Sequence, residues 1–369
     1  MPLGRRTVLS TAALAASAAP ALGQTQRKPA PRPEPAPAAK PKPKGREAHA
    51  GSPADTPLAP LDTAAKWAYV EDFQTGATLV DKLADEEMPP SSMTKLMTMY
   101  LVYDRLKEGR LRLEDELPVS ERAWRMGGSK MFVQVGATAK VEDLIRGVIV
   151  QSGNDACIVL AEALAGSEEQ FAELMNQKAA QIGLTRSKFR NATGWPDPEQ
   201  RMSARDIATL AKRIIRDFPE YYHYDAEKAF KYNGIDQPNR NPMVQKGTAD
   251  GLKTGHTDAG GYGLVASSIR NGRRLVMVLN GMATMRERAE EAERIMDWSF
   301  ANFENVTLFA ANEAVERAPV WLGTEPTVAL VSGRDLTVTV PRTWRKNASI
   351  KVAYRAPVEA PVAKGTVLG

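Results

Sequence analysis

Ser92 and Lys95 have types and a spacing that could support nucleophilic catalysis. They form a Ser-x-x-Lys element at the start of a helix predicted over 92–107, and residues three apart in a helix project from the same side. A serine hydroxyl needs a base, and lysine can serve as one if burial and a second cation lower its pKa. The backbone N–H groups of the first helical turn would also face an oxyanion that forms there. Because both residue types are common in helices, this pair alone does not establish catalysis.

A second polar element, Ser152-Gly153-Asn154, separates two apolar helical patterns at 144–150 and 156–164. In a catalytic site, the Ser152 hydroxyl could carry a proton, and the Asn154 amide could hold a substrate backbone. Taken alone, the same residues are typical of a turn followed by a helix cap.

The third element is Lys253-Thr254-Gly255, which precedes a predicted β-hairpin and should therefore form an edge strand. The free N–H and C=O groups of an edge strand can pair with an extended peptide, and Gly255 would let that peptide approach closely. Lys253 would supply the second positive charge, and the hydroxyls of Thr254 and Thr257 could bind a carboxylate. The alternative is a solvent-exposed turn.

The order of the three elements is more informative than any one of them. Together they would supply a nucleophile (Ser92), a base (Lys95), a proton carrier (Ser152), an anion site (Lys253) and a docking edge. This order predicts an active-site serine enzyme.

Other site chemistries have little support in the composition. The chain has three histidines (His49, His223 and His256) and one cysteine, Cys157. These numbers argue against a metal cluster, and we expect neither a metal nor a cofactor. A Ser-His-Asp triad is not excluded by counting, but it could use only His223 or His256. Cys157 should be a buried, apolar-like thiol.

The charge of the chain is concentrated at its N-terminal end. The formal net charge is +5, but residues 1–60 carry an excess of six positive charges, which leaves about −1 for residues 61–369. Nucleic-acid binding requires a basic face on the folded domain, so the charge distribution argues against it.

Residues 1–23 have the pattern of an export signal. Arg5 and Arg6 form a basic segment, 8–19 is a short apolar run, and 21–23 is a small-x-small cleavage site. The Arg pair also fits a twin-arginine signal, so the sequence leaves open which export route is used.

The segment 24–60 is rich in Pro, Ala and Lys and has no apolar periodicity. It should therefore form a disordered linker, with folded structure beginning near Asp62.

The body of the chain, 61–304, interleaves predicted strands and helices. Strands are expected at 67–71 and 77–80, and at 262–269 and 275–282 with the hairpin turn Asn271-Gly272 between them. Ser167 and Ser203 each precede a predicted helix, and a further amphipathic helix covers 286–303. The late antiparallel hairpin favours an α+β class over a parallel doubly wound sheet. Residues 305–369 are predicted to form a small all-β domain because short alternating stretches such as 336–340 lie among Gly, Pro and Asn.

With these motifs and their surroundings, the sequence resembles the low-molecular-mass penicillin-binding proteins of the D-alanyl-D-alanine carboxypeptidase type, peptidase family S11. The resemblance is carried by the segments 90–95, 144–147, 151–157 and 251–257, and it spans about 68–369. It implies a serine β-lactamase/transpeptidase-like domain, in which an antiparallel sheet packs with helices. It also implies removal of the terminal D-alanine from peptidoglycan stem peptides ending in D-Ala-D-Ala, through an acyl-enzyme that β-lactam antibiotics also form.

The resemblance further implies roles for individual residues. The backbone N–H groups of Ser92 and His256 would form the oxyanion hole, so that the His256 backbone matters more than its ring. Arg240 would help to hold the terminal carboxylate of the substrate.

The sequence departs from the family pattern at its C-terminal end. Members usually continue the β module and then carry an amphipathic membrane-anchoring helix, whereas 365–369 is expected to end inside that module. The chain is expected to be exported to the periplasm, and attachment to the outer face of the inner membrane stays open.

Two alternatives compete with the carboxypeptidase. A serine β-lactamase shares the three motifs, but segment 190–197 lacks the Glu-x-x-Leu-Asn pattern that supplies a deacylating water. A non-catalytic peptidoglycan-binding protein could retain the pocket, yet every catalytic position is intact.

Overall fold

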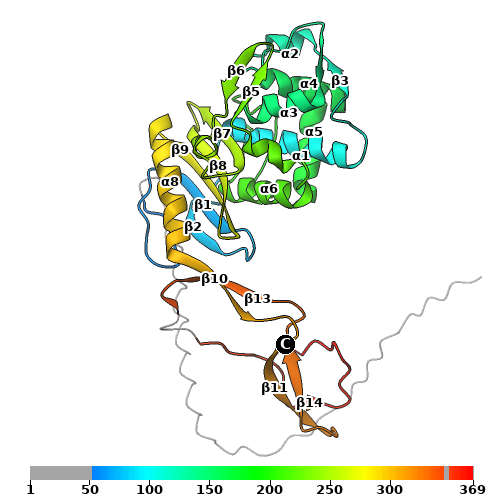
Figure 1. The fold of residues 1–369 in the computed structure, drawn as a ribbon, viewed down its shortest axis with the longest axis vertical. Helices are drawn as coiled ribbons and strands as arrows, with labels where there is room; N and C mark the ends of the chain where they lie inside the picture. Colours follow the sequence, from blue (N-terminus) through cyan, green and yellow to red (C-terminus); the bar gives the residue numbers. More distant parts are fainter. Residues whose placement is uncertain (1–51, 345–348, 369) are drawn as a thin grey trace, which may run out of the picture. The chain divides into compact units, whose positions relative to one another are not determined.

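A computed structural model describes residues 52–344 and 349–368. The predicted export signal, 1–23, and most of the predicted linker lie outside the described residues. The central element of the described structure is a five-stranded antiparallel sheet in the order β2-β1-β9-β8-β7 (Figure 1). The strands are β1 (Trp67–Asp72), β2 (Thr78–Lys82), β7 (Gly251–Thr257), β8 (Gly261–Arg270) and β9 (Arg273–Met282).

The hairpin of β8 and β9 forms the middle of this sheet, and its turn follows from the sequence. Asn271 and Gly272 have φ of 50° and 78°, the left-handed values that Asn and Gly accept most readily and that a tight two-residue hairpin requires. The predicted strands at 67–71 and 77–80 also pair, as β1 and β2. The edge position predicted for the Lys253-Thr254-Gly255 segment is confirmed, because β7 is the last strand of the sheet.

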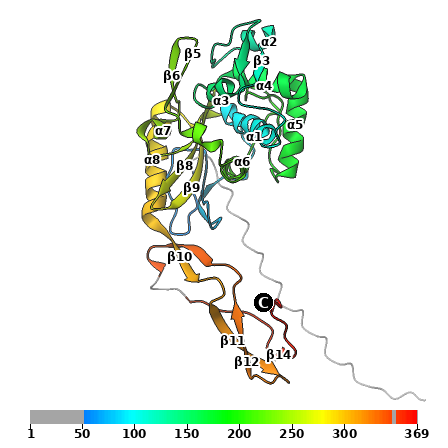
Figure 2. The same cartoon turned by 45° about the vertical axis from the view of Figure 1, so that its right-hand side comes forward.

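Helices cover both faces of the sheet. Helix α8 (Met285–Asn302) packs on β8 and β9 from one side, and α6 (Ala204–Asp217) packs on β1 and β9 from the other (Figure 2). Beyond α6 lies a helical layer around a large apolar core. Its members are α1 (Lys95–Lys107), α2 (Glu121–Arg125), α3 (Val141–Ile149), α4 (Asn154–Ala165) and α5 (Glu168–Gln181).

Two predicted helix starts are confirmed by their capping bonds. The Ser167 side chain accepts from the backbone N–H of Gln170, and the Ser203 side chain accepts from that of Asp206. Smaller elements complete the domain: β3 (Glu116–Pro118), β4 (Thr138–Lys140), η2 (Tyr222–Ala226), β5 (Ala229–Tyr232), β6 (Ile235–Pro238) and α7 (Pro242–Lys246).

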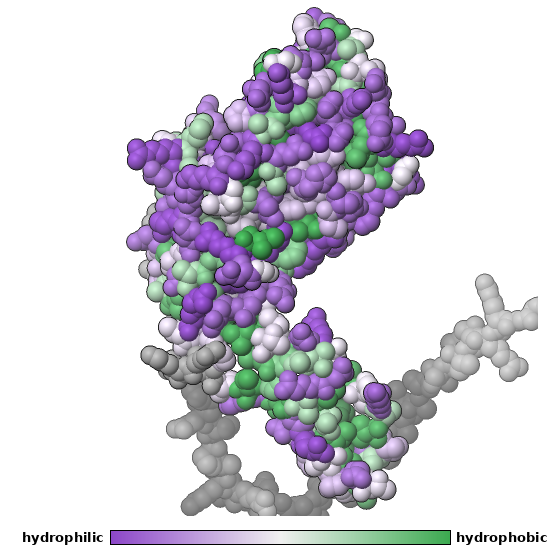
Figure 3. All heavy atoms as spheres, in the orientation of Figure 1, coloured by the Kyte–Doolittle hydropathy of each residue, from purple (hydrophilic) through white to green (hydrophobic). Residues whose placement is uncertain are grey.

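The last part of the chain is β-structure, as predicted. Strand β10 pairs with β13, and β11 pairs with β12 and with β14. These strands are β10 (Phe303–Phe309), β11 (Ala314–Trp321), β12 (Thr327–Val331), β13 (Leu336–Pro341) and β14 (Val358–Glu359). Apolar side chains gather on the surface here, as Figure 3 shows. Trp321 and Leu322, at the end of β11, are both exposed.

Packed structure begins earlier than the sequence analysis predicts. Ala54 is fully buried and exchanges backbone hydrogen bonds with Leu61, and Asp55 does the same with Asp81 of β2. The prediction of a linker extending to residue 60 is therefore wrong for its last residues. The pairing depends on backbone groups, which a Pro-rich composition does not reveal.

The helix predicted over 92–107 begins differently. Residues Ser91–Thr94 form a 3-10 turn, η1, and the α-helix α1 starts at Lys95. The N–H of Lys95, which caps this turn, donates to the carbonyl of Ser92 three residues before it, so the two residues lie on the same side of the turn. Within the described residues, we find no helix with the length and apolar character needed to cross a membrane.

Candidate active site

Ser92 and Lys95 meet at the junction of η1 and α1. The Nζ of Lys95 lies 2.9 Å from the Oγ of Ser92. Ser92 is half-buried, whereas Lys95 is fully buried. The structure therefore gives the serine hydroxyl access to a ligand and keeps its neighbour away from water.

Lys95 has two further hydrogen-bond acceptors. Its Nζ lies 2.7 Å from Oδ1 of Asn154 and 2.5 Å from the carbonyl oxygen of Thr193. Burial lowers the pKa of Lys95 to about 8, and the positive charge of Arg240 acts in the same direction. A lysine with this pKa is neutral in about one molecule in ten at pH 7, which makes a general base available.

Asn154 reaches Lys95 because α4 begins at a tightly packed turn. The Asn154 backbone N–H donates to the carbonyl of Ser129, and its Nδ2 donates to the carbonyl of Gly127 at 2.8 Å. A side chain at Gly153 would meet the Met131 backbone N at 3.0 Å, so the turn depends on glycine. The amide of Asn154 is thus fixed with its oxygen toward Lys95.

Ser152 lies between the helical layer and the sheet. Its Oγ accepts a hydrogen bond of 2.9 Å from the Nζ of Lys253 on β7. Burial lowers the pKa of Lys253 well below its ordinary value, and the charges of Lys95 and Arg240 lower it further. Ser152 has φ of 59°, an uncommon left-handed conformation for a residue other than Gly, Asn or Asp, which is typical of functional sites.

Strand β7 lies close against η1, and Gly255 permits this contact. A Cβ at Gly255 would lie 3.0 Å from Cβ of Ser91 and 3.3 Å from the backbone N of Ser92. Because Gly255 has no side chain, β7 can approach η1, the turn that carries Ser92 and is called the nucleophile turn below. The expectation that Gly255 lets a substrate peptide approach closely stays a prediction. The contact with η1 is a further reason for glycine here, which sequence alone does not show.

The remaining predicted residues of β7 face in alternate directions. Thr257 Oγ1 lies 2.9 Å from the Oγ of Ser91, on the side of the nucleophile. The His256 ring stacks on Tyr262 with the ring centroids 3.9 Å apart. The His256 ring is therefore occupied by its contact with Tyr262, whereas the His256 backbone lies in the edge strand of the sheet. Thr254, which follows Lys253 on β7, is buried.

Arg240 lies in the segment after β6, close to the two lysines. Its Nη1 lies 2.6 Å from the Oγ of Ser129, on the loop that also contacts Asn154. The positive charge of Arg240 lowers the pKa of both Lys95 and Lys253, and its role in holding a carboxylate stays a prediction.

Cys157 is fully buried on α4, as predicted. Burial raises the pKa of its thiol to about 12, so it is uncharged at neutral pH. No group of three or more potential metal-binding side chains occurs in the part of the chain that the structure describes.

The loop 191–195 contributes to the site in a way that no sequence motif indicated. Asn191 Oδ1 accepts backbone N–H bonds from Thr193, Gly194 and Trp195, and this arrangement aims the Thr193 carbonyl at Lys95. Every residue has a backbone carbonyl group, whatever its side chain. The type of residue 193 therefore does not indicate that its carbonyl contacts Lys95.

Comparisons with known proteins show the family of the chain. Residues 53–284 match the family model "D-alanyl-D-alanine carboxypeptidase", peptidase S11, and residues 303–369 match the C-terminal domain of penicillin-binding protein 5. The chain belongs to the D-alanyl-D-alanine carboxypeptidase family. This finding confirms both the predicted family and the predicted transpeptidase-like fold with an all-β C-terminal domain.

Individual relatives of this family cover most of the chain. The D-alanyl-D-alanine carboxypeptidase DacC of Escherichia coli is 40% identical over 84% of this chain and 80% of its own length. The crystal structure of penicillin-binding protein 5 from Haemophilus influenzae has a TM-score of 0.77 and 37% identity, covering 85% of this chain and 93% of that one. Penicillin-binding protein D2 of Listeria monocytogenes, solved in the ampicillin bound form, has a TM-score of 0.60 and 26% identity, covering 66% and 100%.

Proposed function

We propose that this family member is a serine-type D-alanyl-D-alanine carboxypeptidase that forms its acyl-enzyme on Ser92. The observation that carries the proposal is the 2.9 Å contact between Ser92 Oγ and a fully buried Lys95 whose pKa is lowered to about 8. The substrate is a peptidoglycan stem peptide ending in D-Ala-D-Ala.

Binding begins at the edge of the sheet. The stem peptide extends along β7, and its terminal carboxylate meets the positive charges of Lys253 and Arg240, with the hydroxyl of Thr254 beside them. A bound carboxylate stabilises the charged form of Lys253 and so offsets the desolvation that burial imposes. The carbonyl of the penultimate D-alanine then lies over Ser92, between the backbone N–H groups of Ser92 and His256.

Acylation needs two proton transfers: one removes the proton of the Ser92 hydroxyl, and the other protonates the departing amine. Neutral Lys95 accepts the proton of the Ser92 hydroxyl as Oγ bonds to the carbonyl carbon. Lys253 donates to the oxygen of Ser152, and the Ser152 O–H protonates the departing amine. As that proton leaves, the proton of Lys253 moves to the Ser152 oxygen, so Ser152 stays neutral, and the proton released when the ester is later hydrolysed to a carboxylate restores Lys253. The C–N bond then breaks, D-alanine leaves, and water later cleaves the Ser92 ester.

β-Lactams are proposed to acylate the same serine. Their amide resembles the D-Ala-D-Ala bond, and the ring keeps the leaving group attached. Loop 190–197 offers its Thr193 carbonyl to Lys95 and contains no Glu that could activate a deacylating water, which supports a long-lived adduct.

The proposed location is the periplasm, where the substrate lies, and Arg5-Arg6 with the following apolar run supports export. Catalysis is assigned to residues 61–304 together with the packed residues just before them, and 305–369 is proposed as a separate β domain. A fluorescent fusion retained in the cytoplasm would contradict the export proposal.

The decisive experiment incubates the mature protein with a D-Ala-D-Ala peptide and, separately, with penicillin. We expect released D-alanine and a penicilloyl adduct on Ser92, both lost in Ser92→Ala. Rapid penicillin turnover without D-alanine release would indicate a β-lactamase. Neither an adduct nor turnover would indicate a non-catalytic binding protein.

A further inference from the structure

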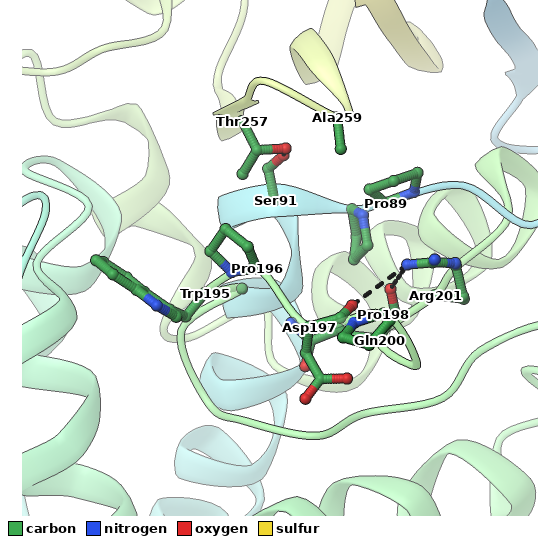
Figure 4. A pocket seen from close by; sticks show the side chains of 12 residues that line it. Pro89, Ser91, Trp195, Pro196, Asp197, Pro198, Gln200, Arg201, Thr257 and Ala259 are labelled. Atoms are coloured by element: carbon green, nitrogen blue, oxygen red, sulfur yellow. Dashed lines mark hydrogen bonds between the residues drawn. The ribbon is translucent and has the colours of Figure 1, made fainter.

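A cavity of about 230 Å³ adjoins the nucleophile turn and has no part in the acylation steps (Figure 4). Its lining includes Ser91, which precedes the nucleophile, and Thr257, which ends β7. The loop that follows Thr193 supplies the opposite wall through Trp195 and Pro196. Sites for whole small ligands measure about 300–1,000 Å³, so this volume suits one side chain of a longer ligand.

The position of the cavity along β7 indicates which part of the substrate reaches it. The carboxylate site lies at Lys253 and Thr254, and the cavity lies at Thr257, three residues further along the strand. An extended strand rises about 3.3 Å per residue, and a peptide paired with it has the same rise. The residue that precedes the D-alanine pair therefore comes level with the cavity.

The walls of the cavity are rigid and mainly apolar. Trp195 lies against the glycine pair of the Asn154 loop: a Cβ at Gly127 or Gly128 would lie 3.1 Å from its ring. The ring is held there, and 46% of Trp195 is exposed to a ligand. Four prolines also line the cavity, namely Pro89, Pro90, Pro196 and Pro198. Such a surface favours an aliphatic chain, which loses contact with water when it binds.

One end of the cavity carries an unneutralised positive charge. The Nη1 of Arg201 donates to the backbone carbonyls of Asp197 and Gln200, at 3.3 and 2.9 Å. Among the described residues, no carboxylate forms an ion pair with Arg201. Asp197 also lines the cavity, but its Oδ1 accepts the N–H of Glu199 and its carboxylate points away from Arg201 (Figure 4).

We propose that this cavity binds the side chain of the residue preceding the D-alanine pair and selects a long aliphatic side chain that ends in a carboxylate, held by Arg201. Aliphatic atoms would lie on Trp195 and the prolines, and the carboxylate would accept charge-assisted hydrogen bonds from the guanidinium. The inference rests on the proposed function, because it takes the direction of the peptide from the carboxylate site.

The test uses two peptides, acetyl-X-D-Ala-D-Ala, in which X is meso-diaminopimelate or L-lysine. Their side chains both end in an ammonium group and differ by one carboxylate. For the full chain, we expect kcat/KM for D-alanine release to be about tenfold higher with the diaminopimelate peptide. In Arg201→Gln the ratio between the peptides should fall to near one, and in Arg201→Lys it should be intermediate.

Arg190→Gln is the matched control. Arg190 belongs to the same loop and pairs with Glu199 at 3.5 Å, but it does not line the cavity. This variant should keep the tenfold ratio. A ratio near one in the unaltered protein, or an unchanged ratio in Arg201→Gln, would overturn the inference.

Affinity measurements separate this inference from the proposed function. The same peptides are titrated into Ser92→Ala by calorimetry, which needs no turnover. If the unaltered protein releases no D-alanine from either peptide, the proposed function fails. The cavity is then judged by whether Ser92→Ala prefers the diaminopimelate peptide and loses that preference in Ser92→Ala/Arg201→Gln. Equal affinities in Ser92→Ala would overturn the inference.

Discussion

The Nζ of Lys95 lies 2.9 Å from the Oγ of Ser92 and has no contact with solvent. Its other two acceptors are uncharged: the amide oxygen of Asn154 and the carbonyl of Thr193. Uncharged acceptors stabilise an ammonium less than a carboxylate does, so burial controls its protonation. The pair is therefore a serine with a base close to neutral pH.

The rate of acylation should depend on pH through Lys95. Its pKa is lowered to about 8, and only the neutral amine accepts a proton, so activity increases as pH rises through that value. Below pH 7, the second-order rate constant for acylation by penicillin should fall about tenfold per pH unit. Stopped-flow measurements between pH 6 and 9.5 check this. A flat profile across that range would contradict the role of Lys95.

Two substitutions of Asn154 should distinguish the loss of a hydrogen-bond acceptor for Lys95 from the addition of a negative charge beside Lys95. Asn154→Asp places a carboxylate on Lys95, which raises the lysine pKa and should move the acid limb upward by about 1–3 pH units. Asn154→Ala removes an acceptor without adding charge, so acylation should slow without that upward movement.

Asn302→Asp on α8 is the control for this pair, since the Asn302 side chain donates to the carbonyl of Trp298 in the same helix. Its pH profile should match that of the unaltered protein. An unchanged acid limb in Asn154→Asp would show that Asn154 does not govern the protonation of Lys95.

Gly255→Ala should impair acylation through the backbone. The new methyl group would lie 3.3 Å from the backbone N of Ser92, so β7 must move away from the nucleophile turn. The two N–H groups proposed for the oxyanion hole would then separate, and loss of one such donor costs about 10²–10³-fold in rate. We expect a loss near the lower end, measured as penicillin acylation at pH 8.

Gly333→Ala is the matched control because a Cβ there meets no atom within 4 Å. It should leave acylation unchanged. If both variants acylate at the rate of the unaltered protein, the close approach of β7 does not control the oxyanion hole.

Asn191→Ala should affect both stability and the pH profile. The Asn191 side chain accepts hydrogen bonds from three backbone N–H groups, and the N–H of Trp195 also donates to the hydroxyl of Thr193. A hydrogen bond of this kind contributes about 0.5–1.5 kcal/mol, so the variant should be less stable. As the Thr193 carbonyl moves away, the Lys95 ammonium loses an acceptor, so the lysine pKa should fall and the acid limb should move to lower pH.

Thermal unfolding and the acylation profile are measured together for this variant. Asn191→Asp keeps an acceptor oxygen and should restore most of the stability. A lower melting temperature with an unmoved acid limb would mean that Asn191 stabilises the loop without acting on Lys95.

Much of the fold could be predicted from local patterns. The turn Asn271-Gly272 requires left-handed backbone that these residues adopt readily, so it located the central hairpin. The edge position of Lys253 followed from its place before that hairpin. The 3-10 turn at Ser91 could not be predicted in this way. It packs against Gly194, where a Cβ would come within 1.9 Å of the Ser91 carbonyl, and this neighbour is about a hundred residues away in sequence.

For this protein, the sequence by itself determined the chemistry that is available: Ser92, Lys95, Ser152 and Lys253, in an order that predicted an acylating serine. Those groups are side chains, and side-chain chemistry is visible in residue types. Only the tertiary structure decided how Lys95 is tuned and how β7 closes on Ser92. The burial of Lys95 and the Thr193 carbonyl depend on distant segments meeting, and backbone groups are the same at every position of a sequence.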